Sequence, residues 1–250
     1  LKLSGLVMSP KVSVIIPCYN ASSFIDETVS SVLSQSYENI EIVAVDNESE
    51  DDTYEKLSKY SKSNKNFILE TAKNIYPFCW DEARQKGLEV CTGDYITTLC
   101  SDDLYDVDYI RKCVQISERL KGKISLIQSP IRGIDIGGKE INRVGHVYEG
   151  LDDFKNLAVT KCPVTSPTVF YKRKIYDDGL IKTYPEKYSG AADYDLYCRL
   201  ADQGHYILPV PSWIGYNYRW HVEQATWGMH KSKINYDSLI QSYWREKWNP

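Results

Sequence analysis

The stretch GDYITTLCSDDLY, residues 93–105, is the part of this sequence from which the fold and the chemistry are best predicted. Residues 95–99 are apolar and β-branched enough to form a buried strand, and a polar turn with the adjacent carboxylates of Asp102 and Asp103 follows them. Carboxylates at the carboxyl end of a strand lie where open α/β sheets bind ligands. Two neighbouring oxygen donors suit Mg²⁺ or Mn²⁺ shared with the phosphates of a substrate. The stretch alone is equally compatible with an acidic cap on the next helix.

The composition of the 250-residue chain narrows the class of protein. Charged residues make up 26% and the net charge is −4, so nothing in the composition points to nucleic acid as a partner. Seven cysteines without a CxxC pair argue against a disulfide framework and fit a reducing compartment. No apolar run reaches the roughly 18 residues of a membrane span, and no signal peptide opens the chain. We therefore expect a cytoplasmic protein that does not bind nucleic acid.

The first half of the chain alternates strand and helix patterns. Continuous apolar runs predict buried parallel strands, and apolar residues at helical spacing predict amphipathic helices between them. We expect Ser22 or Ser23 to cap the first helix, and Ser49 with Asp52 to cap the second. The alternation predicts an α/β fold with a doubly wound, mostly parallel central sheet and helices on both faces. The predicted strands are residues 12–16, 40–45, 67–69, 95–99 and 124–128, and the predicted helices are residues 24–33, 54–60, 80–91 and 108–120.

The second half of the chain changes character. Residues 131–147 carry the Gly137-Gly138 turn between β-prone arms and predict a hairpin within a smaller mixed subregion. Residues 194–203 predict a helix, and residues 235–248 predict an amphipathic helix that packs on the domain. Because no linker or repeat is visible, we expect a single domain. Its parts are a tag remnant or disordered lead (1–10), two functional halves (11–130 and 131–230) and a C-terminal helix (231–250).

Three predicted strands end in polar residues, and right-handed crossovers place the carboxyl ends of parallel strands on the same side of a sheet. These ends carry residues 17–20, 46–49 and 101–103, across which a base, a ribose and a diphosphate could lie. Neither a GxGxxG motif after the first strand nor a GxxxxGK[ST] loop is present, which argues against a dinucleotide-binding Rossmann site and a P-loop. Phosphate bound here would need a metal to neutralise it. This favours the metal interpretation of Asp102 and Asp103.

Four motifs in this order closely resemble family-2 glycosyltransferases with the GT-A fold. The resemblance covers the chain from Lys11 to about His221. It implies that residues 11–130 bind a nucleotide sugar and that residues 131–230 bind the acceptor. The motifs are VSVIIPCYNASSFIDETVSSVLSQSYENIEIVAVDNESEDDT (12–53), DEARQKGLEVCTGDYITTLCSDD (81–103), SGAADYDLYCRLADQG (189–204) and YNYRWH (216–221).

The resemblance assigns a nucleotide-binding role to residues of the first half. Asp46, together with Asn47, is expected to hydrogen-bond a pyrimidine ring. Arg84 is expected beside the base or the diphosphate, and Asp102 at the ribose or the donor sugar. The remaining residues expected to line the nucleotide pocket are Pro17, Tyr19 and Asn20.

The resemblance also assigns the metal and the catalytic base. Asp103 is expected to hold Mn²⁺ or Mg²⁺, and His221 to join the metal or the diphosphate. Asp193 matches the general base of the family. Asp195 is expected to be structural instead, because Arg199 follows it at the i,i+4 spacing of a helical ion pair.

The chain departs from the family pattern at three places. Asn47 stands where many members carry a second Asp, and Cys100 replaces a frequent Asp in the strand-end motif. Residues 74–77 (NIYP) replace the usual Asn-x-Gly before the Ala-Arg helix, so a bulkier loop is expected beside the donor sugar.

These assignments imply an inverting glycosyltransferase that moves a sugar from a UDP- or dTDP-linked donor to a hydroxyl of a glycan or lipid-linked glycan. Two alternatives are open at this point, a sugar-1-phosphate nucleotidyltransferase and a non-catalytic glycan-binding module of transferase ancestry. The former usually needs a Gly-rich basic loop after the first strand, which residues 17–20 are not. The C-terminal helix offers a second location, peripheral at the inner face of a membrane where a lipid-linked acceptor is presented.

Overall fold

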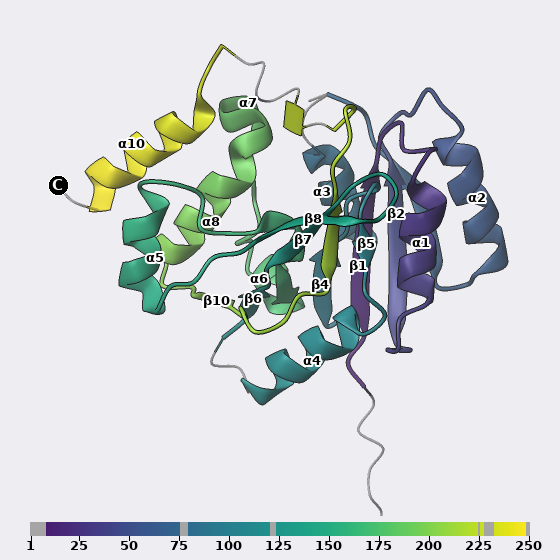
Figure 1. The fold of residues 1–250 in the computed structure, drawn as a ribbon, viewed down its shortest axis with the longest axis horizontal. Coiled ribbons are helices and arrows are strands. Elements are labelled where there is room, and N and C mark those ends of the chain that lie inside the picture. The colour runs from purple at the N-terminus through teal and green to yellow at the C-terminus, as the bar shows by residue number, and fades with distance from the viewer. Residues whose placement is uncertain (1–8, 76–79, 121–123, 225, 228–232, 249–250) are drawn as a thin grey trace, which may run out of the picture.

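The computed structural model describes residues 9–75, 80–120, 124–224, 226–227 and 233–248 (Figure 1). The lead predicted at residues 1–10 lies outside the described residues except for its last two. The same holds for residues 76–77 of the loop that was expected to be bulky.

A seven-stranded sheet forms the centre of the molecule, in the order β10-β6-β9-β4-β1-β2-β3 (Figure 1). Its neighbouring strands are parallel except at β9, which lies antiparallel between β4 and β6. The predicted mostly parallel α/β sheet is therefore confirmed, with one reversed strand from the second half inside it. The strands are β1 (Val12–Cys18), β2 (Ile40–Asp46), β3 (Phe67–Thr71), β4 (Tyr95–Thr98), β6 (Leu126–Gln128), β9 (Phe170–Lys172) and β10 (Ile207–Pro209).

Strands β1, β2 and β4 bring their carboxyl ends to one edge of the sheet. All seven residues of β1 are buried, as its continuous apolar run predicts. Cys18 pairs with Asp46 at the ends of β1 and β2, and the Leu99 amide after β4 donates to the Ile15 carbonyl at 2.9 Å. The polar loops that follow these three strands therefore lie next to one another, as the sequence predicts.

Helices cover both faces of the sheet, as predicted. One face packs against α1, α2 and α4 through residues such as Ile25 and Leu57. The other face packs against α3, α5, α6, α8 and α10 through residues such as Leu88 and Phe154. Figure 1 shows α1 and α2 on one side of the central strands and α5, α8 and α10 on the other. The helices are α1 (Ile25–Leu33), α2 (Thr53–Ser63), α3 (Asp81–Val90), α4 (Tyr109–Arg119), α5 (Gly150–Ala158), α6 (Arg173–Asp177), α7 (Pro185–Tyr188), α8 (Ala192–Asp202) and α10 (Tyr236–Trp248).

A second, four-stranded sheet of mixed direction lies beside the first, in the order β5-β11-β7-β8. It contains the predicted hairpin, β7 (Ile131–Ile134) and β8 (Glu140–Val144), whose turn places Gly138 at a φ of 83°. Its other strands are β5 (Leu104–Tyr105) and β11 (Tyr216–Arg219). The two halves of the chain interlace, because β5 of the first half joins this sheet while β9 and β10 of the second half join the central one.

The cap predicted for the first helix is wrong. Helix α1 begins at Ile25 and neither Ser22 nor Ser23 caps it through its side chain. The Ser22 amide instead donates to the Asp51 carboxylate at 2.9 Å, which ties the loop after β1 to the loop after β2.

The cap predicted for the second helix is also wrong. The Asp51 carboxylate accepts from the Thr53 amide at 3.0 Å at the start of α2, and Asp52 makes no side-chain cap. The Ser49 hydroxyl accepts from the Asn20 amide at 3.0 Å. These side chains join two loops of the site, and a capping rule based on local sequence does not foresee that use.

Helix α10 confirms the amphipathic helix predicted near the carboxyl end. Ile240 and Trp244 are buried against the domain, where they join the core formed with α5 and α8. Contact of this helix with a membrane stays a prediction. Among the helices of the described residues, none combines the length and the apolar character that a membrane span requires.

Candidate active site

A cleft of about 420 Å³ opens at the carboxyl edge of the central sheet. Its walls come from the loop after β1, the turn after β4, the start of α8 and the segment after β11. Asp46, Arg84 and Asp103, which are also predicted site residues, are buried next to residues of the cleft wall and do not line the cleft themselves. The predicted site residues that line the cleft are Pro17, Tyr19, Asn20, Asn47, Asp102, Asp193 and His221.

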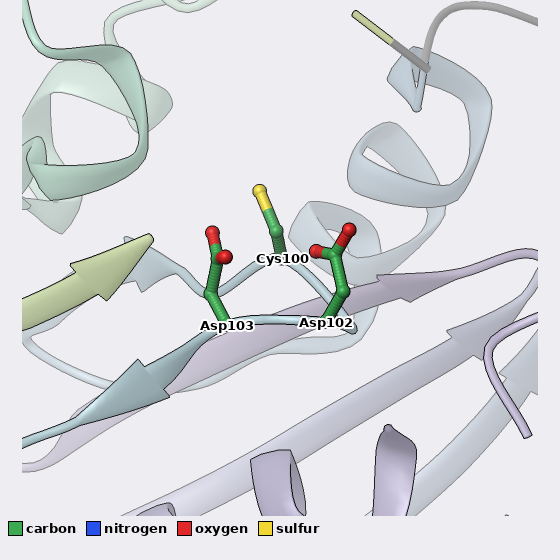
Figure 2. A group of neighbouring side chains, drawn as sticks. All are labelled: Cys100, Asp102 and Asp103. Atoms are coloured by element: carbon green, nitrogen blue, oxygen red, sulfur yellow. The ribbon is translucent and has the colours of Figure 1, made fainter. Parts of the chain in front are cut away.

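The turn after β4 carries a compact group of possible metal ligands. Donor atoms of Cys100, Asp102 and Asp103 all lie within 4.8 Å of one another. Figure 2 shows the three side chains rising from one turn and pointing to the same side of it. Cys100 and Asp102 line the cleft, whereas Asp103 is fully buried. The turn therefore presents one carboxylate and one thiol to the cleft and keeps the second carboxylate behind them.

Asp103 is held by two donors from β11. The Tyr216 hydroxyl donates to one carboxylate oxygen at 2.7 Å, and the Arg219 amide donates to the other at 2.8 Å. Burial raises the pKa of Asp103 well above its usual range, and the negative charge of Asp102 raises it further. Asp102 is the carboxylate that faces the cleft, and a metal-binding role for Asp103 stays a prediction.

Arg219 is a site residue that the sequence analysis missed. Its guanidinium is buried and donates to the Asp102 carbonyl at 2.9 Å, and it forms an ion pair with Glu27 of α1 at 2.6 Å. It therefore fixes the backbone of the acidic turn between β11 and α1. Its place in the YNYRWH motif, two residues before His221, was the available signal.

His221 lies beside the cleft-facing carboxylate, and its metal or diphosphate role stays a prediction. Its Nε2 atom is 2.9 Å from Asp102 Oδ2, and its ring packs on Phe24 with centroids 4.7 Å apart. The imidazole and the carboxylate thus converge on one point of the cleft from two distant parts of the chain. A cation at Asp102 would find a nitrogen donor next to it.

The end of β2 provides an unsatisfied acceptor for a base. Asp46 is buried, and its Oδ1 atom has no hydrogen-bond partner within the part of the chain that the structure describes. Its other oxygen accepts from the Ser49 amide at 3.1 Å. A buried acceptor without a donor is costly, so a donor supplied by a ligand would stabilise this end of the cleft. The N–H group of a pyrimidine ring is such a donor.

Asn47 and Asn20 shape the same end of the cleft through the backbone. With its amide oriented to satisfy hydrogen bonding, Asn47 donates to the Lys73 carbonyl at 3.0 Å. A carboxylate could not donate there, which gives a physical reason for Asn at this position. Asn20 has a φ of 47° and accepts from the Glu50 amide at 2.8 Å. This bond holds the left-handed conformation that Asn tolerates better than most residues.

Arg84 does not line the cleft, and its expected place beside the base or the diphosphate stays a prediction. Its guanidinium is buried against Asp81 at 2.8 Å and donates to the Thr183 hydroxyl at 2.9 Å. This ion pair lines an adjoining cavity of about 40 Å³. Arg84 therefore joins α3 to the segment before α7.

Asp193 lies in the first turn of α8 and lines both the cleft and the small cavity. It was expected just before this helix. The Tyr194 amide donates to its Oδ1 atom at 2.8 Å. Burial raises the pKa of Asp193, and the Ser166 hydroxyl and the Tyr194 amide partly oppose that rise. A carboxylate with a raised pKa is a stronger base, placed on the wall of a cleft large enough for a substrate.

A family model described as "Glycosyl transferase family 2" matches residues 13–180, more than half of the chain. An uncharacterized glycosyltransferase of Rickettsia felis is 31% identical over 193 residues, which are 77% of this chain and 30% of that protein. AmsB of Erwinia amylovora, an amylovoran biosynthesis glycosyltransferase, is 28% identical over 251 residues, which are 95% of this chain and 77% of that protein. The chain thus spans under a third of the first relative and most of the second.

Solved structures share the architecture at low sequence identity. Residues 1–349 of S. aureus TarS in complex with UDP superpose with a TM-score of 0.67 at 17% identity, covering 94% of this chain and 70% of that one. The mannosyltransferase PcManGT of Pyrobaculum calidifontis, in complex with GDP-Man and Mn²⁺, gives a TM-score of 0.62 at 16% identity. The superposition covers 96% of this chain and 71% of that one. The fold is the GT-A fold, and the chain belongs to glycosyltransferase family 2.

Proposed function

We propose that this chain moves a sugar from a nucleotide-diphosphate sugar of the UDP or dTDP type to a hydroxyl of a glycan or glycolipid, with inversion at the anomeric carbon. One observation carries the proposal. The base candidate Asp193 and the cation candidate Asp102 line the same cleft, which is about 420 Å³ in volume. An inverting transfer needs such a pair of groups around one donor.

The nucleotide would lie along the ends of β1 and β2. The unsatisfied Oδ1 atom of Asp46 fits the ring N–H of uracil or thymine, which supports a UDP- or dTDP-type donor. Pro17, Tyr19 and Asn20 line the same end of the cleft. UDP in the TarS complex supports the same class of donor, whereas the PcManGT complex holds GDP-Man.

The turn after β4 fits a divalent cation, Mn²⁺ or Mg²⁺. Asp102 would bind it from the cleft wall, Asp103 stands directly behind as a further possible ligand, and His221 stands next to Asp102. When bound, the cation supplies positive charge that offsets the charge developing on the departing diphosphate. Arg219 would keep the turn in place through its bonds to the Asp102 carbonyl and Glu27.

Asp193 would act as the general base. Its carboxylate takes the proton of the acceptor hydroxyl while the hydroxyl oxygen forms a bond to the anomeric carbon of the donor. The bond from that carbon to the diphosphate oxygen breaks, and its electron pair leaves with the nucleoside diphosphate. A single displacement with one base inverts the anomeric configuration.

A panel of nucleotide sugars, offered with Mn²⁺ and a set of glycan acceptors, tests the proposal. We expect nucleoside diphosphate to be released from a UDP- or dTDP-sugar, with EDTA stopping the release and added Mn²⁺ restoring it. A nucleotidyltransferase would instead release pyrophosphate from a nucleoside triphosphate and a sugar phosphate. A binding module would take up a sugar or nucleotide without turnover. Either pattern, or full turnover in EDTA, would contradict the proposal.

A further inference from the structure

The cleft-facing turn contains a sulfur donor at a place where an oxygen donor would suit Mg²⁺ better. Cys100, Asp102 and Asp103 form the only group of three or more His, Cys, Asp or Glu side chains within metal-binding reach among the described residues. Figure 2 shows the Cys100 sulfur between the two carboxylates and directed to the same side as they are. The sulfur therefore lies in the candidate cation site, in space as well as in the sequence of the turn.

The spacing of these atoms fits one cation. Cations of this class bind thiolate sulfur at about 2.3 Å and oxygen or nitrogen at about 2.0–2.2 Å, so ligand atoms around one ion lie about 3–4 Å apart. The donor atoms of the turn all lie within 4.8 Å of one another without an ion. His221 Nε2 is already 2.9 Å from Asp102 Oδ2. Small side-chain rotations would bring sulfur, oxygen and nitrogen around one centre.

Cys100 differs from the other cysteines of the described residues in its surroundings. Cys18 also touches the cleft, but it is buried and donates to the Ile16 carbonyl at 3.2 Å. Cys91, Cys113 and Cys198 are buried. Cys100 is half-buried and lines the cleft beside Asp102, and small apolar packing alone does not require a thiol there.

The chemistry of sulfur sets the expected selectivity. Mg²⁺ takes oxygen ligands almost exclusively, whereas thiolate favours borderline and soft cations such as Zn²⁺, Co²⁺ and Cd²⁺. We propose that Cys100 is a direct ligand of the divalent cation together with Asp102, and that it shifts the selectivity of the site away from Mg²⁺ toward thiophilic cations. The inference rests on the proposed metal-assisted transfer. It adds a ligand and a selectivity that the proposed function does not itself require.

Co²⁺ titration of the full chain tests this inference by absorbance, with and without UDP. A cobalt–thiolate bond gives a sulfur-to-cobalt charge-transfer band in the near ultraviolet. We expect the wild-type chain to show a saturable band, Cys100→Ser to lose it, and Cys162→Ser to keep it. Cys162 is a matched control because it is half-buried too, and its thiol donates to the Val164 carbonyl outside the turn. A wild-type chain without the band, or a band that survives in Cys100→Ser, would overturn the inference.

Cys100→Asp gives a second readout that does not depend on loss of the thiol band. Because an oxygen donor replaces sulfur, the ratio of Cd²⁺ to Mg²⁺ affinity, measured by competition calorimetry, should fall by at least about tenfold. An unchanged ratio would overturn the inference. Sugar transfer in Mn²⁺ without a cobalt band would overturn it and leave the proposed function standing. A cobalt band without transfer from any donor would contradict the proposed function alone.

Discussion

Asp102 and Asp103 are adjacent in sequence, yet their carboxylates have different surroundings. Asp102 lines the cleft beside His221, whereas Asp103 is fully buried with both oxygens accepting from β11. A buried acceptor with two donors is part of the fold, because removing it leaves both donors unsatisfied. The division of roles between the two residues is therefore set by what surrounds each carboxylate.

Replacing each carboxylate by its amide separates these roles. Asp103→Asn should lower the free energy of unfolding by about 1–3 kcal/mol, because the amide has only one oxygen for the two donors Tyr216 O–H and Arg219 N–H. Asp102→Asn should leave stability almost unchanged and remove most of the metal-dependent activity. Urea unfolding and transfer rates of both variants measure the difference. The reverse order, with Asp102→Asn the less stable protein, would contradict the assignment.

The raised pKa of Asp193 predicts where transfer fails in acid. Burial raises this pKa above the ordinary 3.8 of an aspartate, so the neutral form appears at a higher pH than it would in an exposed residue. The base is present above the raised pKa and is lost as the pH falls through it. We expect the acid limb of kcat/KM to lie above pH 3.8 and to be absent from the residual activity of Asp193→Asn. The same limb in both proteins would assign it to another group.

At the scale of elements, α8 and α10 are joined through Asp195. One of its oxygens accepts from Arg199 Nε at 2.8 Å, as the i,i+4 spacing predicts, and the other accepts from Trp244 Nε1 at 3.1 Å. An exposed helical ion pair is worth about half a kcal/mol. Asp195 and Trp244 are both buried, so a larger contribution is expected here. The bond ties the helix that carries Asp193 to the last helix of the chain.

Asp195→Asn tests this link between the two helices. The Asn side chain has one oxygen for the two donors, so one buried hydrogen bond is lost. The free energy of unfolding should fall by about 1–3 kcal/mol. Asp178→Asn is the matched control, since its i,i+4 pair with Lys174 at 2.8 Å is exposed and should cost under about 0.5 kcal/mol. Denaturant unfolding compares the two. An equal loss of unfolding free energy in the two variants would show that the hydrogen bonds of Asp195 contribute no more than an exposed ion pair.

The elements that the sequence predicts best are those fixed by local apolar patterning. Strands β1, β2 and β4 and helices α4 and α10 fall within about two residues of their predicted bounds because each buries a continuous run or one helical face. The reversed strand β9 and the two-residue β5 could not be predicted, since their short sequences acquire a strand conformation only from their partners.

The candidate site could be predicted from the sequence only in part. The strand-end loops and Asp102 meet at the cleft because topology alone brings parallel strand ends together. His221 follows β11 of the mixed sheet, and only the resemblance to the family pointed to it. The burial of Asp103, the enclosure of Arg84 by Asp81 and the role of Arg219 depend on contacts between distant segments. A motif gives the residue type at such positions but not the direction of the side chain.

At the scale of the molecule, the cleft exists because the two sheets interlace. The central sheet provides the strand ends that would hold the nucleotide, and β11 of the mixed sheet passes behind the acidic turn and continues to His221. Helix α8 approaches from the face opposite to α1 and brings Asp193 to the cleft. The proposed base and the proposed cation-binding turn would therefore reach one substrate from separate elements.

The most direct test of this account compares the transfer rate and the donor affinity of the wild-type chain and Asp193→Asn. Asn keeps the size of the side chain but cannot accept the proton, so turnover should fall by about 10²- to 10⁴-fold. Nucleoside diphosphate affinity, measured by calorimetry with Mn²⁺, should stay near that of the wild type, because Asp46 and Asp102 are unchanged. The wild-type product should have the inverted anomeric configuration by NMR. Normal turnover of Asp193→Asn, or a product with retained configuration, would contradict the single displacement with Asp193 as base.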